Sequence, residues 1–388
     1  MIRNTVSVKL KEKSREYKVK IGHDLLKSCG EWSQQCLSAS TKKIALISNN
    51  KKVFDLYGET VKQSFKDAGF EVFICLTGDG EKHKNFRSLE KLLKLFSENR
   101  LTRTDAVVAL GGGVVGDLAG FAAAIYLRGI AFLQIPTTVL AMIDSSVGGK
   151  TGINSDFGKN LIGAFHQPKG VLIDVATLKT LPKREILSGS YEAIKQGAIG
   201  GKRLFNQTAE FLNNYSQNDF AKHFSNPEFL SNLEDLIAEQ VIFKAQIVMN
   251  DERESMDKTD ARSRKILNFG HTIGHALEKV TNYDYFKHGE AVAYGMLAAG
   301  EIAKNIGIFE KNELKSLNDV VGLPGELPDA NNIEINDVID ALEFDKKSTG
   351  ESLQWILLKK IGKPVIVDGK KIPKKILQES LKKVLKNK

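Results

Sequence analysis

Runs of β-branched and other apolar residues alternate with amphipathic helical patterns through the first half of the chain. Strands are expected at residues 17–21, 43–48, 71–76, 106–110, 131–135 and 171–173, and helices between them at 54–68 and 88–99. Parallel strands need long crossover connections, which amphipathic helices usually provide. The alternation therefore predicts an α/β fold with a mostly parallel sheet and helices on its faces.

The second half follows a different pattern. After about Pro182 long helical patterns dominate, at 228–250, 266–280 and 290–305, and a short hairpin is expected at 353–358 and 364–367 around Gly362. A chain of 388 residues is longer than one hydrophobic core usually serves. We therefore expect an α/β domain followed by a mostly α-helical one, with the boundary near residue 181.

A glycine-rich turn follows the strand expected at 106–110. Gly111, Gly113 and Gly116 fit the pattern G-x-G-x-x-G, and a helix is expected at 118–127. In this setting backbone amides and a helix N-terminus can bind the pyrophosphate of a dinucleotide. The acidic residue that a Rossmann unit places on the ribose is missing, because the next strand ends in QIPTT at 134–138. A turn needed only for close packing is the alternative.

A second glycine cluster, VGGKT at 147–151, imitates the end of a phosphate-binding P-loop. The first glycine of that motif would fall on Asp144, so this interpretation fails. Lys150 instead belongs to a dense group of polar residues, which need solvent or a ligand. The group also contains Arg128, Asp144, Ser145, Ser146, Lys159, Asn160 and His166.

Three of the seven histidines lie within a short stretch of sequence. His271 and His275 are four residues apart, so they project from the same face of a helix, and His288 follows an aromatic loop. Two imidazoles and a carboxylate are the ligands of a catalytic zinc site with one open position. Alternatively, the histidine pair only shares a face. The flanking Gly270 and Gly274 weigh against this, because glycine costs a helix about 1 kcal/mol and suggests that something bulky lies against the backbone.

Glu192 and Lys195 lie three residues apart on one face of an expected helix. The simple interpretation is a surface ion pair, which is worth less than about 1 kcal/mol. The alternative makes Glu192 the missing carboxylate ligand of the metal site.

Charge and composition narrow the class of protein. With 42% hydrophobic and 27% charged residues the chain has an ordinary globular composition, and its three cysteines lack metal-binding spacing. We expect a cytoplasmic protein with no membrane partner, because no run of about 18 apolar residues and no apolar leader occurs. The net charge of +9 comes from scattered lysines, the densest run being a solvated terminal helix at 370–388. This suits a small polyanionic substrate and no nucleic acid.

Together these motifs resemble those of the 3-dehydroquinate synthases, a family of sugar phosphate cyclases. The matching segments are 111–120, 134–154 (QIPTTVLAMIDSSVGGKTGIN), 158–174 (GKNLIGAFHQPKGVLID), 191–197, 267–278 (LNFGHTIGHALE) and 288–296 (HGEAVAYGM). The resemblance implies a Rossmann-like NAD-binding domain at 1–181, a helical metal- and substrate-binding domain at 182–388, an active site between them, and a homodimer.

The resemblance also assigns roles to individual residues. It makes Glu192, His271 and His288 the ligands of Zn²⁺, with Co²⁺ as an alternative, and His275 an acid/base or orienting group. Lys150, Lys195, Arg264 and Asn268 join His275 as catalytic residues. The implied substrate contacts are Arg128, Asp144, Lys150, Asn160, Lys195, Lys244, Arg264, Asn268 and Lys346 or Lys347. The implied NAD contacts are Asn49, Asn50, Lys51, Glu81, Lys84, Gly112, Gly113, Val114, Asp117, Thr137, Thr138, Lys159, Thr177, Leu178, Lys179 and Thr180.

The family's reaction explains why the site needs so many cations. Its substrate, 3-deoxy-D-arabino-heptulosonate 7-phosphate, carries a phosphate and a carboxylate, both of which suit lysine and arginine. The implied sequence is oxidation by NAD, phosphate elimination, re-reduction, ring opening and aldol closure to 3-dehydroquinate.

The chain departs from the family pattern at one place. A polar insertion, residues 255–263, replaces a short glycine turn, so a role for Glu254 is in doubt and Arg262 rivals Arg264. Two other enzymes stay open: a sugar phosphate cyclase that makes an epi-valiolone, and a metal-dependent polyol dehydrogenase. Asn268 and the segment Asp345-Lys346-Lys347 favour the dehydroquinate enzyme, because its substrate carries a carboxylate.

Overall fold

The first half of the chain folds around a six-stranded parallel sheet, seen in a computed structural model that describes residues 16–49, 51–255, 257–349 and 353–386. The strand order is β1-β8-β5-β4-β2-β3, with every neighbouring pair parallel. All six predicted strands are confirmed to within one residue at each end. They are β1 Lys18–Gly22, β2 Lys43–Asn49, β3 Glu71–Thr77, β4 Ala106–Gly111, β5 Ala131–Pro136 and β8 Gly170–Asp174.

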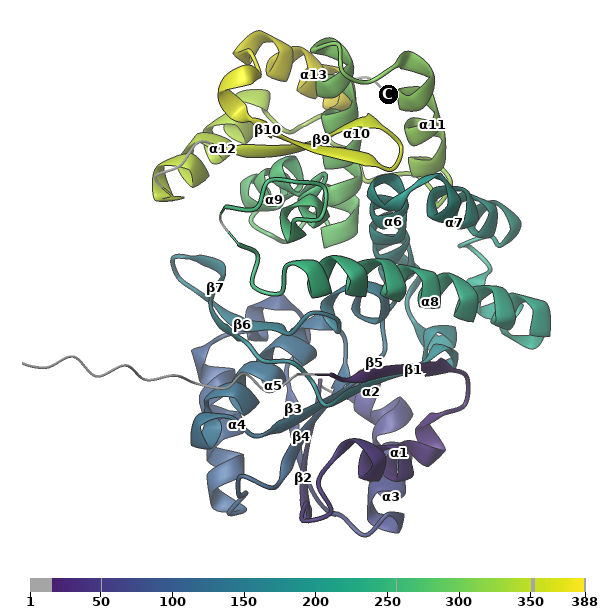
Figure 1. Cartoon of the computed structure of the whole chain (residues 1–388), viewed down its shortest axis with the longest axis vertical. Coiled ribbons are helices and arrows are strands. Elements are labelled where there is room, and N and C mark those ends of the chain that lie inside the picture. Colours follow the sequence, from purple (N-terminus) through teal and green to yellow (C-terminus); the bar gives the residue numbers. More distant parts are fainter. Residues whose placement is uncertain (1–15, 50, 256, 350–352, 387–388) are drawn as a thin grey trace, which may run out of the picture.

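Helices cover both faces of this sheet (Figure 1). Ile44 and Leu46 of β2 pack toward the side of α1 Cys29–Cys36 and α3 Glu59–Asp67. Ala45 and Ile47 pack toward the other side, where α4 Phe86–Glu98 and α5 Gly113–Ile125 lie. Successive side chains of a strand point to opposite faces, so a strand buried on both sides is apolar throughout.

The sheet reverses its strand order between β2 and β4. The chain runs from β2 outward to β3, then returns to place β4 on the other side of β2. In open α/β sheets ligands bind at such a switch point, beyond the carboxyl ends of the strands. The predicted glycine turn lies there, because α5 begins at Gly113 directly after β4, earlier than the expected start at residue 118.

An antiparallel hairpin that the sequence did not predict leaves this sheet. It consists of β6 Lys150–Ser155 and β7 Gly158–Phe165. Strand propensities do not predict this hairpin, because it is rich in glycine and glycine is depleted in strands. The glycines are needed for close approach: a Cβ on Gly163 would lie 2.1 Å from the Thr151 carbonyl oxygen. The hairpin carries the predicted polar residues toward the helical half.

The second half is mostly helical, as expected. Its helices are α6 Lys183–Gly200, α7 Lys202–Asn214, α8 Pro227–Asn250, α9 His271–Val280, α10 His288–Asn305, α11 Lys311–Val321, α12 Ile335–Thr349 and α13 Lys374–Lys386, with the predicted hairpin formed by β9 Gln354–Lys360 and β10 Lys363–Asp368. Helix α10 lies at the centre, against α6, α9 and α13 (Figure 1). The predicted helix 266–280 begins only at His271, since Gly270 adopts a left-handed conformation after a 3-10 turn at Arg264–Asn268.

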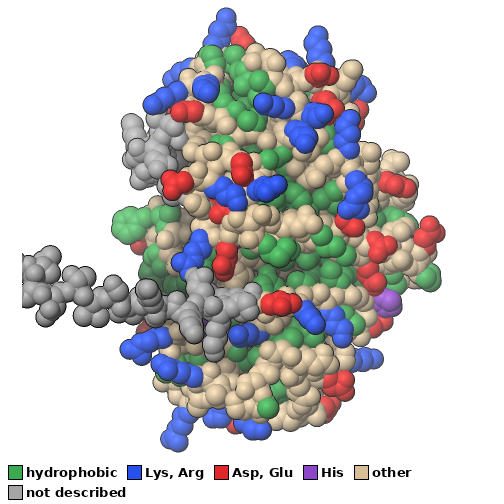
Figure 2. Space-filling view, in the orientation of Figure 1, with side chains coloured by type: hydrophobic (Ala, Val, Ile, Leu, Met, Phe, Trp, Pro, Cys, Tyr) green, Lys and Arg blue, Asp and Glu red, His purple; other side chains and the backbone are tan. Residues whose placement is uncertain are grey.

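The terminal helix α13 is docked, which corrects the expectation of a purely solvated helix. Leu381 and Leu385 are buried in the core, and Lys383 lies 2.5 Å from the buried Glu301 of α10. The many lysines of this helix lie on its outer face, and they obscured the apolar residues that recur at helical spacing on its inner face. Within the described ranges no helix has the length and apolar composition to cross a membrane. Figure 2 shows basic and acidic side chains interspersed over one face of the molecule.

Candidate active site between the two halves

Glu192, His271 and His288 come together from three helices. Glu192 lies within α6, His271 begins α9 and His288 begins α10. Oε1 of Glu192 lies 3.8 Å from Nε2 of His271 and 3.6 Å from Nε2 of His288. One ligand atom from each residue lies within 4.8 Å of the others, a spacing that suits one metal ion. His275 lies one turn from His271 but outside this group of three.

The backbones of α9 and α10 touch, and this contact sets the positions of the two histidines. Gly270 caps α9 with a φ of +80°, a conformation that favours glycine. A Cβ on Gly295 of α10 would lie 1.8 Å from the Gly270 carbonyl oxygen. The bulk that the sequence predicted against Gly270 and Gly274 is therefore the backbone of α10.

Replacing Gly295 by Ala should destabilise this helix pair. The added methyl group meets a carbonyl oxygen, which no side-chain rotation relieves, and overpacking of this kind costs about 1 to 3 kcal/mol. We expect a loss near the upper end, measured by denaturant unfolding. Gly322→Ala is the matched control, because its Cβ would make an ordinary contact of 3.4 Å with Asp319. Equal losses in both variants would contradict the role assigned to the contact between α9 and α10.

Glu192 is a fully buried carboxylate without hydrogen bonds from the described residues. Its relative exposure is 0%, and among the described residues neither oxygen has a hydrogen-bond partner. Nζ of Lys195 lies 2.5 Å from Oε2, but this contact is an ion pair that lacks hydrogen-bond geometry. A buried anion is stable only when it is paired and coordinated. The residues present therefore fit a divalent cation at this point.

The electrostatic surroundings keep two of the imidazoles neutral. Burial lowers the pKa of His271 well below its usual value, and the charge of Lys195 adds to this effect. Burial also lowers the pKa of His275, and the positive charge of His288 adds to this effect. A neutral imidazole has a free lone pair, as a metal ligand or a proton acceptor requires.

His288 differs because a carboxylate faces its second nitrogen. Burial lowers the pKa of His288, but the hydrogen bond with Glu278 and the charge of Glu192 outweigh it and raise the pKa. Oε2 of Glu278 lies 3.5 Å from Nδ1, while Nε2 faces Glu192. A proton on Nδ1 leaves Nε2 free for a metal, as in many carboxylate-histidine-metal sites. Sequence reasoning missed Glu278, although it lies three residues after His275 on the same helical face.

Three buried cations lie beside the metal-ligand group. Lys195 and Lys244 have relative exposures of 1% and 5%, and Lys244 Nζ lies 2.6 Å from Asp144 Oδ1. Burial lowers the pKa of Lys195, but Glu192 and Asp144 outweigh this and raise it, so Lys195 stays cationic. Arg264 donates to the carbonyl oxygens of Gly148 and Glu252, and no described carboxylate lies within 4.0 Å of it. This leaves positive charge for an anionic ligand.

The insertion at 255–263 leaves Glu254 inside the site. Its carboxylate contacts Lys150 Nζ and accepts from Asn268 Nδ2 at 3.3 Å, both predicted substrate residues. Arg262 is exposed, whereas Arg264 is buried. Glu254 therefore contacts two residues that the resemblance assigns to the substrate, and of the two arginines only Arg264 is buried.

Most predicted cofactor residues lie along the carboxyl edge of the sheet. Asn49 ends β2, Gly112 and Gly113 follow β4, and Thr137 follows β5. Gly112 offers no side-chain cap to α5, so the helix N-terminus can receive an anion. Within the described chain, Asn49 Oδ1 and Thr137 Oγ1 are buried without hydrogen-bond partners. These orphaned atoms and the uncapped helix fit a dinucleotide.

Other predicted cofactor and substrate residues form a second polar network. Lys84 Nζ lies 2.5 Å from Asp117 Oδ2 and from Asn160 Oδ1. Lys159 lies 3.3 Å from Glu278 and packs over the ring of Tyr283. The segment that holds Thr177, Leu178, Lys179 and Thr180 follows β8 at the same edge of the sheet.

Several predicted residues are not brought into the site. Arg128 is exposed between α5 and β5, at the amino edge of the sheet, where no described contact joins it to the other substrate residues. Asn50 lies outside the described residues. The side chains of Lys51, Lys346 and Lys347 lie outside them too, although their backbones belong to α2 Lys51–Val53 and to α12.

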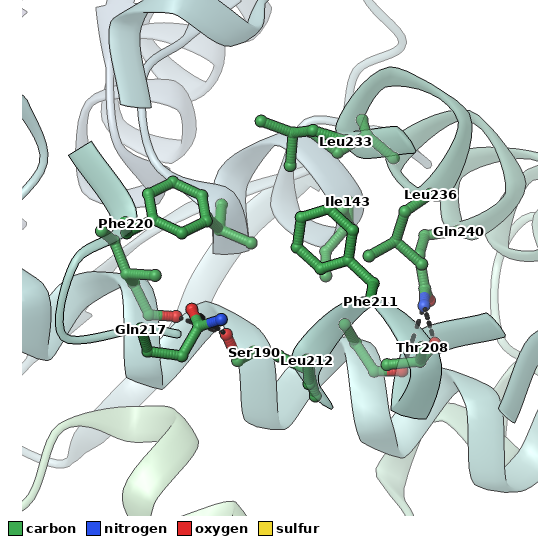
Figure 3. Close-up of a pocket in the computed structure, with 14 residues that line it drawn as sticks. Ile143, Ser190, Thr208, Phe211, Leu212, Gln217, Phe220, Leu233, Leu236 and Gln240 are labelled. Atoms are coloured by element: carbon green, nitrogen blue, oxygen red, sulfur yellow. Dashed lines mark hydrogen bonds between the residues drawn. The ribbon is translucent and has the colours of Figure 1, made fainter. Parts of the chain in front are cut away.

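A small cavity lies behind the site, between α6, α7 and α8 (Figure 3). Its volume is about 30 Å³, and apolar side chains such as Phe211 and Leu236 line most of it. Gln240 donates to Thr208, and Ser190 donates to Gln217. A space of one water molecule cannot hold a sugar phosphate, so the cavity belongs to the packing of the helices.

Fold and site together define a class of protein. A parallel sheet covered by helices and joined to a mostly helical half is the fold of solved sugar phosphate cyclases. The structure is similar to that of 2-deoxy-scyllo-inosose synthase complexed with carbaglucose-6-phosphate, NAD⁺ and Co²⁺, with a TM-score of 0.79, 25% identity and coverage of 94% of this chain and 96% of that one. It also shares its fold with 2-epi-5-epi-valiolone synthase from Streptomyces hygroscopicus, with a TM-score of 0.80, 24% identity and coverage of 99% and 100%.

Sequence comparisons narrow this class to one family. The family models described as 3-dehydroquinate synthase N-terminal and C-terminal match residues 74–188 and 189–348. The 3-dehydroquinate synthase of Nostoc punctiforme is 43% identical over 379 residues, which cover 97% of this chain and 98% of that protein. The chain belongs to the 3-dehydroquinate synthase family, and it is therefore an enzyme. The predicted family and fold class are confirmed.

Proposed function

We propose that this enzyme converts 3-deoxy-D-arabino-heptulosonate 7-phosphate to 3-dehydroquinate and phosphate, a step of the shikimate pathway, with NAD and a divalent metal. The observation that carries the proposal is the close approach of a buried metal-ligand group to buried cations. Lys195 forms an ion pair with Glu192, and the negative charge of Asp144 also stabilises its ammonium group. A polyanionic substrate bound by Arg264 and Lys244 would therefore lie beside the metal.

We propose Glu192, His271 and His288 as the ligands of Zn²⁺, or of Co²⁺. When bound, the metal supplies Lewis acidity toward a substrate hydroxyl. Glu278 supports this role, since its carboxylate orients the ring of His288 from the far side. The buried Oε1 of Glu192, which has no hydrogen-bond partner among the described residues, supports it as well.

We propose that NAD lies along the carboxyl edge of the sheet. Its redox chemistry accounts for the oxidation and the later reduction of the substrate. Gly112, Gly113 and the N-terminus of α5 would hold the pyrophosphate. The unpartnered side-chain oxygens of Asn49 and Thr137 would form hydrogen bonds with the cofactor. Lys84 and Lys159 lie at the hairpin that links this edge to the metal-ligand group.

The remaining residues bind the substrate and move protons. Lys150 and Asn268 converge on Glu254, so the phosphate or carboxylate of the substrate can replace contacts that this glutamate now makes. His275 stays neutral near pH 7 and can accept a proton at a ring nitrogen. Its ring lies 5.3 Å from that of His271, measured between centroids.

The two alternative functions differ in their products. A polyol dehydrogenase would release one NADH per turnover and would not need this set of cations. An epi-valiolone synthase would act on a heptulose phosphate without a carboxylate. The family match and the buried Arg264 favour the dehydroquinate enzyme.

The proposed function is tested by the balance of products. With NAD and metal present, we expect stoichiometric phosphate release from the heptulosonate phosphate and no net NADH absorbance, because the cofactor is regenerated within the turnover. Sedoheptulose 7-phosphate is the matched control substrate without a carboxylate and should release phosphate far more slowly. Stoichiometric NADH from a simple polyol, without phosphate release, would instead establish the dehydrogenase.

The domain boundary, assembly and location are also part of the proposal. The division at 181/182 is supported by α6, which begins at Lys183 after the sheet is complete. A homodimer is supported by the β6–β7 hairpin, which exposes Phe157 and Leu161 at 90% and 65%. Apolar side chains grouped in this way suit a protein contact. A cytoplasmic location accords with a biosynthetic enzyme.

A further inference from the structure

The first turn of α6 holds the end of α10 that begins with His288. Arg184 forms two parallel contacts with Glu290, Nε to Oε1 and Nη2 to Oε2, each 2.7 Å long. The same Nη2 donates to the Tyr285 carbonyl oxygen at 2.5 Å. A guanidinium that binds both oxygens of a carboxylate fixes its orientation as well as its distance.

Glu290 in turn is hydrogen-bonded to the backbone at the N-terminus of α10. Its side chain is only 4% exposed, and Oε2 also accepts from the backbone N–H of Lys287 at 2.7 Å. Lys287 is the N-cap of α10, and His288 is the next residue. The Arg184–Glu290 pair is therefore hydrogen-bonded to the backbone of the residue directly before His288.

Two further contacts join the same pair of helices. Lys287 Nζ lies 2.6 Å from Glu185 Oε1, and Gly289 N donates to Ser188 Oγ at 3.0 Å. Ser188 precedes Glu192 by one helical turn, so both residues lie on the same face of α6. One helix thus supplies the proposed ligand Glu192 and the residues that position His288.

We propose that Arg184 is a positioning residue of the metal site, which sets the separation between the His288 imidazole and the Glu192 carboxylate. The inference rests on the proposed function, because it concerns the metal assigned there. Among the residues whose side chains the structure describes, no hydrogen bond or ion pair joins Arg184 to the metal-ligand residues or to the predicted substrate residues. Its side chain is 47% exposed, so its removal leaves no buried cavity. What it changes is the orientation of the first residue of α10.

The test is metal binding by the purified full chain without substrate. Apo protein is titrated with Co²⁺ against a chelator, and the Co²⁺ absorption spectrum and the melting temperature of the apo protein are recorded. For Arg184→Ala and Arg184→Lys we expect about 10- to 100-fold weaker Co²⁺ binding, as for other residues that orient metal ligands. We also expect an altered Co²⁺ spectrum. Lysine keeps the charge but cannot form the two parallel contacts.

Arg203→Ala is the matched control. Arg203 pairs with Glu239 through the same groups, but on an exposed surface, so its loss should leave Co²⁺ affinity and spectrum unchanged. Ethylguanidinium in the buffer should restore part of the Co²⁺ affinity of Arg184→Ala. Should Arg184→Ala fail to fold, Arg184→Lys decides the question alone.

Each outcome is informative. Wild-type affinity and spectrum in Arg184→Lys would overturn the inference, as would losses matched by Arg203→Ala. If wild-type protein binds Co²⁺ and Glu192→Gln does not, the proposed metal site holds whichever way Arg184 behaves. If Glu192→Gln binds Co²⁺ as wild type does, the proposed ligand set fails, and the inference about Arg184 fails with it.

Discussion

Replacing Glu192 by Gln is expected to abolish most turnover while leaving the fold intact. The amide keeps the shape of the side chain but removes the negative charge that a divalent cation needs. Loss of several kcal/mol of charge stabilisation in the transition state corresponds to a fall of about a thousandfold in kcat/KM. The measurement is steady-state phosphate release at saturating NAD and Zn²⁺, with circular dichroism to confirm folding.

Glu301→Gln controls for the general effect of neutralising a buried carboxylate. Glu301 is 2% exposed and pairs with Lys304 and Lys383 in α10 and α13, away from the metal-ligand group. Its variant should lose stability and keep its turnover number. His288→Ala should behave like Glu192→Gln, and a chelator should inactivate the wild type until Zn²⁺ or Co²⁺ is restored. Full activity of metal-free wild type would refute the metal assignment.

Removing a buried cation is expected to produce the second large effect. Arg264→Ala takes away a guanidinium that is 3% exposed, and loss of one partner from such a contact costs about 2 to 5 kcal/mol. We expect kcat/KM to fall by about 30-fold to several thousandfold. Lys150→Ala should lie at the lower end, because its side chain is 53% exposed and solvent screens its charge.

Lys382→Ala in α13 is the control for overall basicity. Lys382 is exposed, and it lies far along the chain from the site residues, so kcat/KM should not change. Equal losses at Arg264, Lys150 and Lys382 would show that general positive charge, not a defined anion site, governs substrate binding. A salt titration separates the two cases, since Debye screening weakens exposed charges more than buried ones.

Strand prediction succeeded where each strand could be recognised from its own residues. The parallel sheet is apolar on both faces, so the residues of β4, for example, carry the signal without their neighbours. The β6–β7 hairpin was missed because its glycines are selected for backbone contact between strands, which no local pattern reveals. The start of α9 was placed too early for a related reason: the left-handed Gly270 ends the preceding 3-10 turn.

Site prediction followed the same division. Helical spacing indicated a shared face for His271 and His275, and the family resemblance named Glu192 and His288. Neither found Glu278 or Arg184, and the role of Glu254 was left in doubt, because each of these residues is recognised only by a tertiary contact. Glu278 is recognised only by its contact with His288, and Arg184 only by its contact with Glu290, 106 residues away.

The sequence by itself determined the α/β and helical halves, the glycine turn and the chemical character of the site. These depend on periodicity and residue type, which act over a few neighbouring positions. Only the tertiary structure placed His271 and His288 beside Glu192, put Glu254 against Lys150 and left Arg128 exposed, without a described contact to the other predicted substrate residues. Those outcomes depend on where whole helices and strands pack, and packing is settled by contacts between segments that are far apart in the chain.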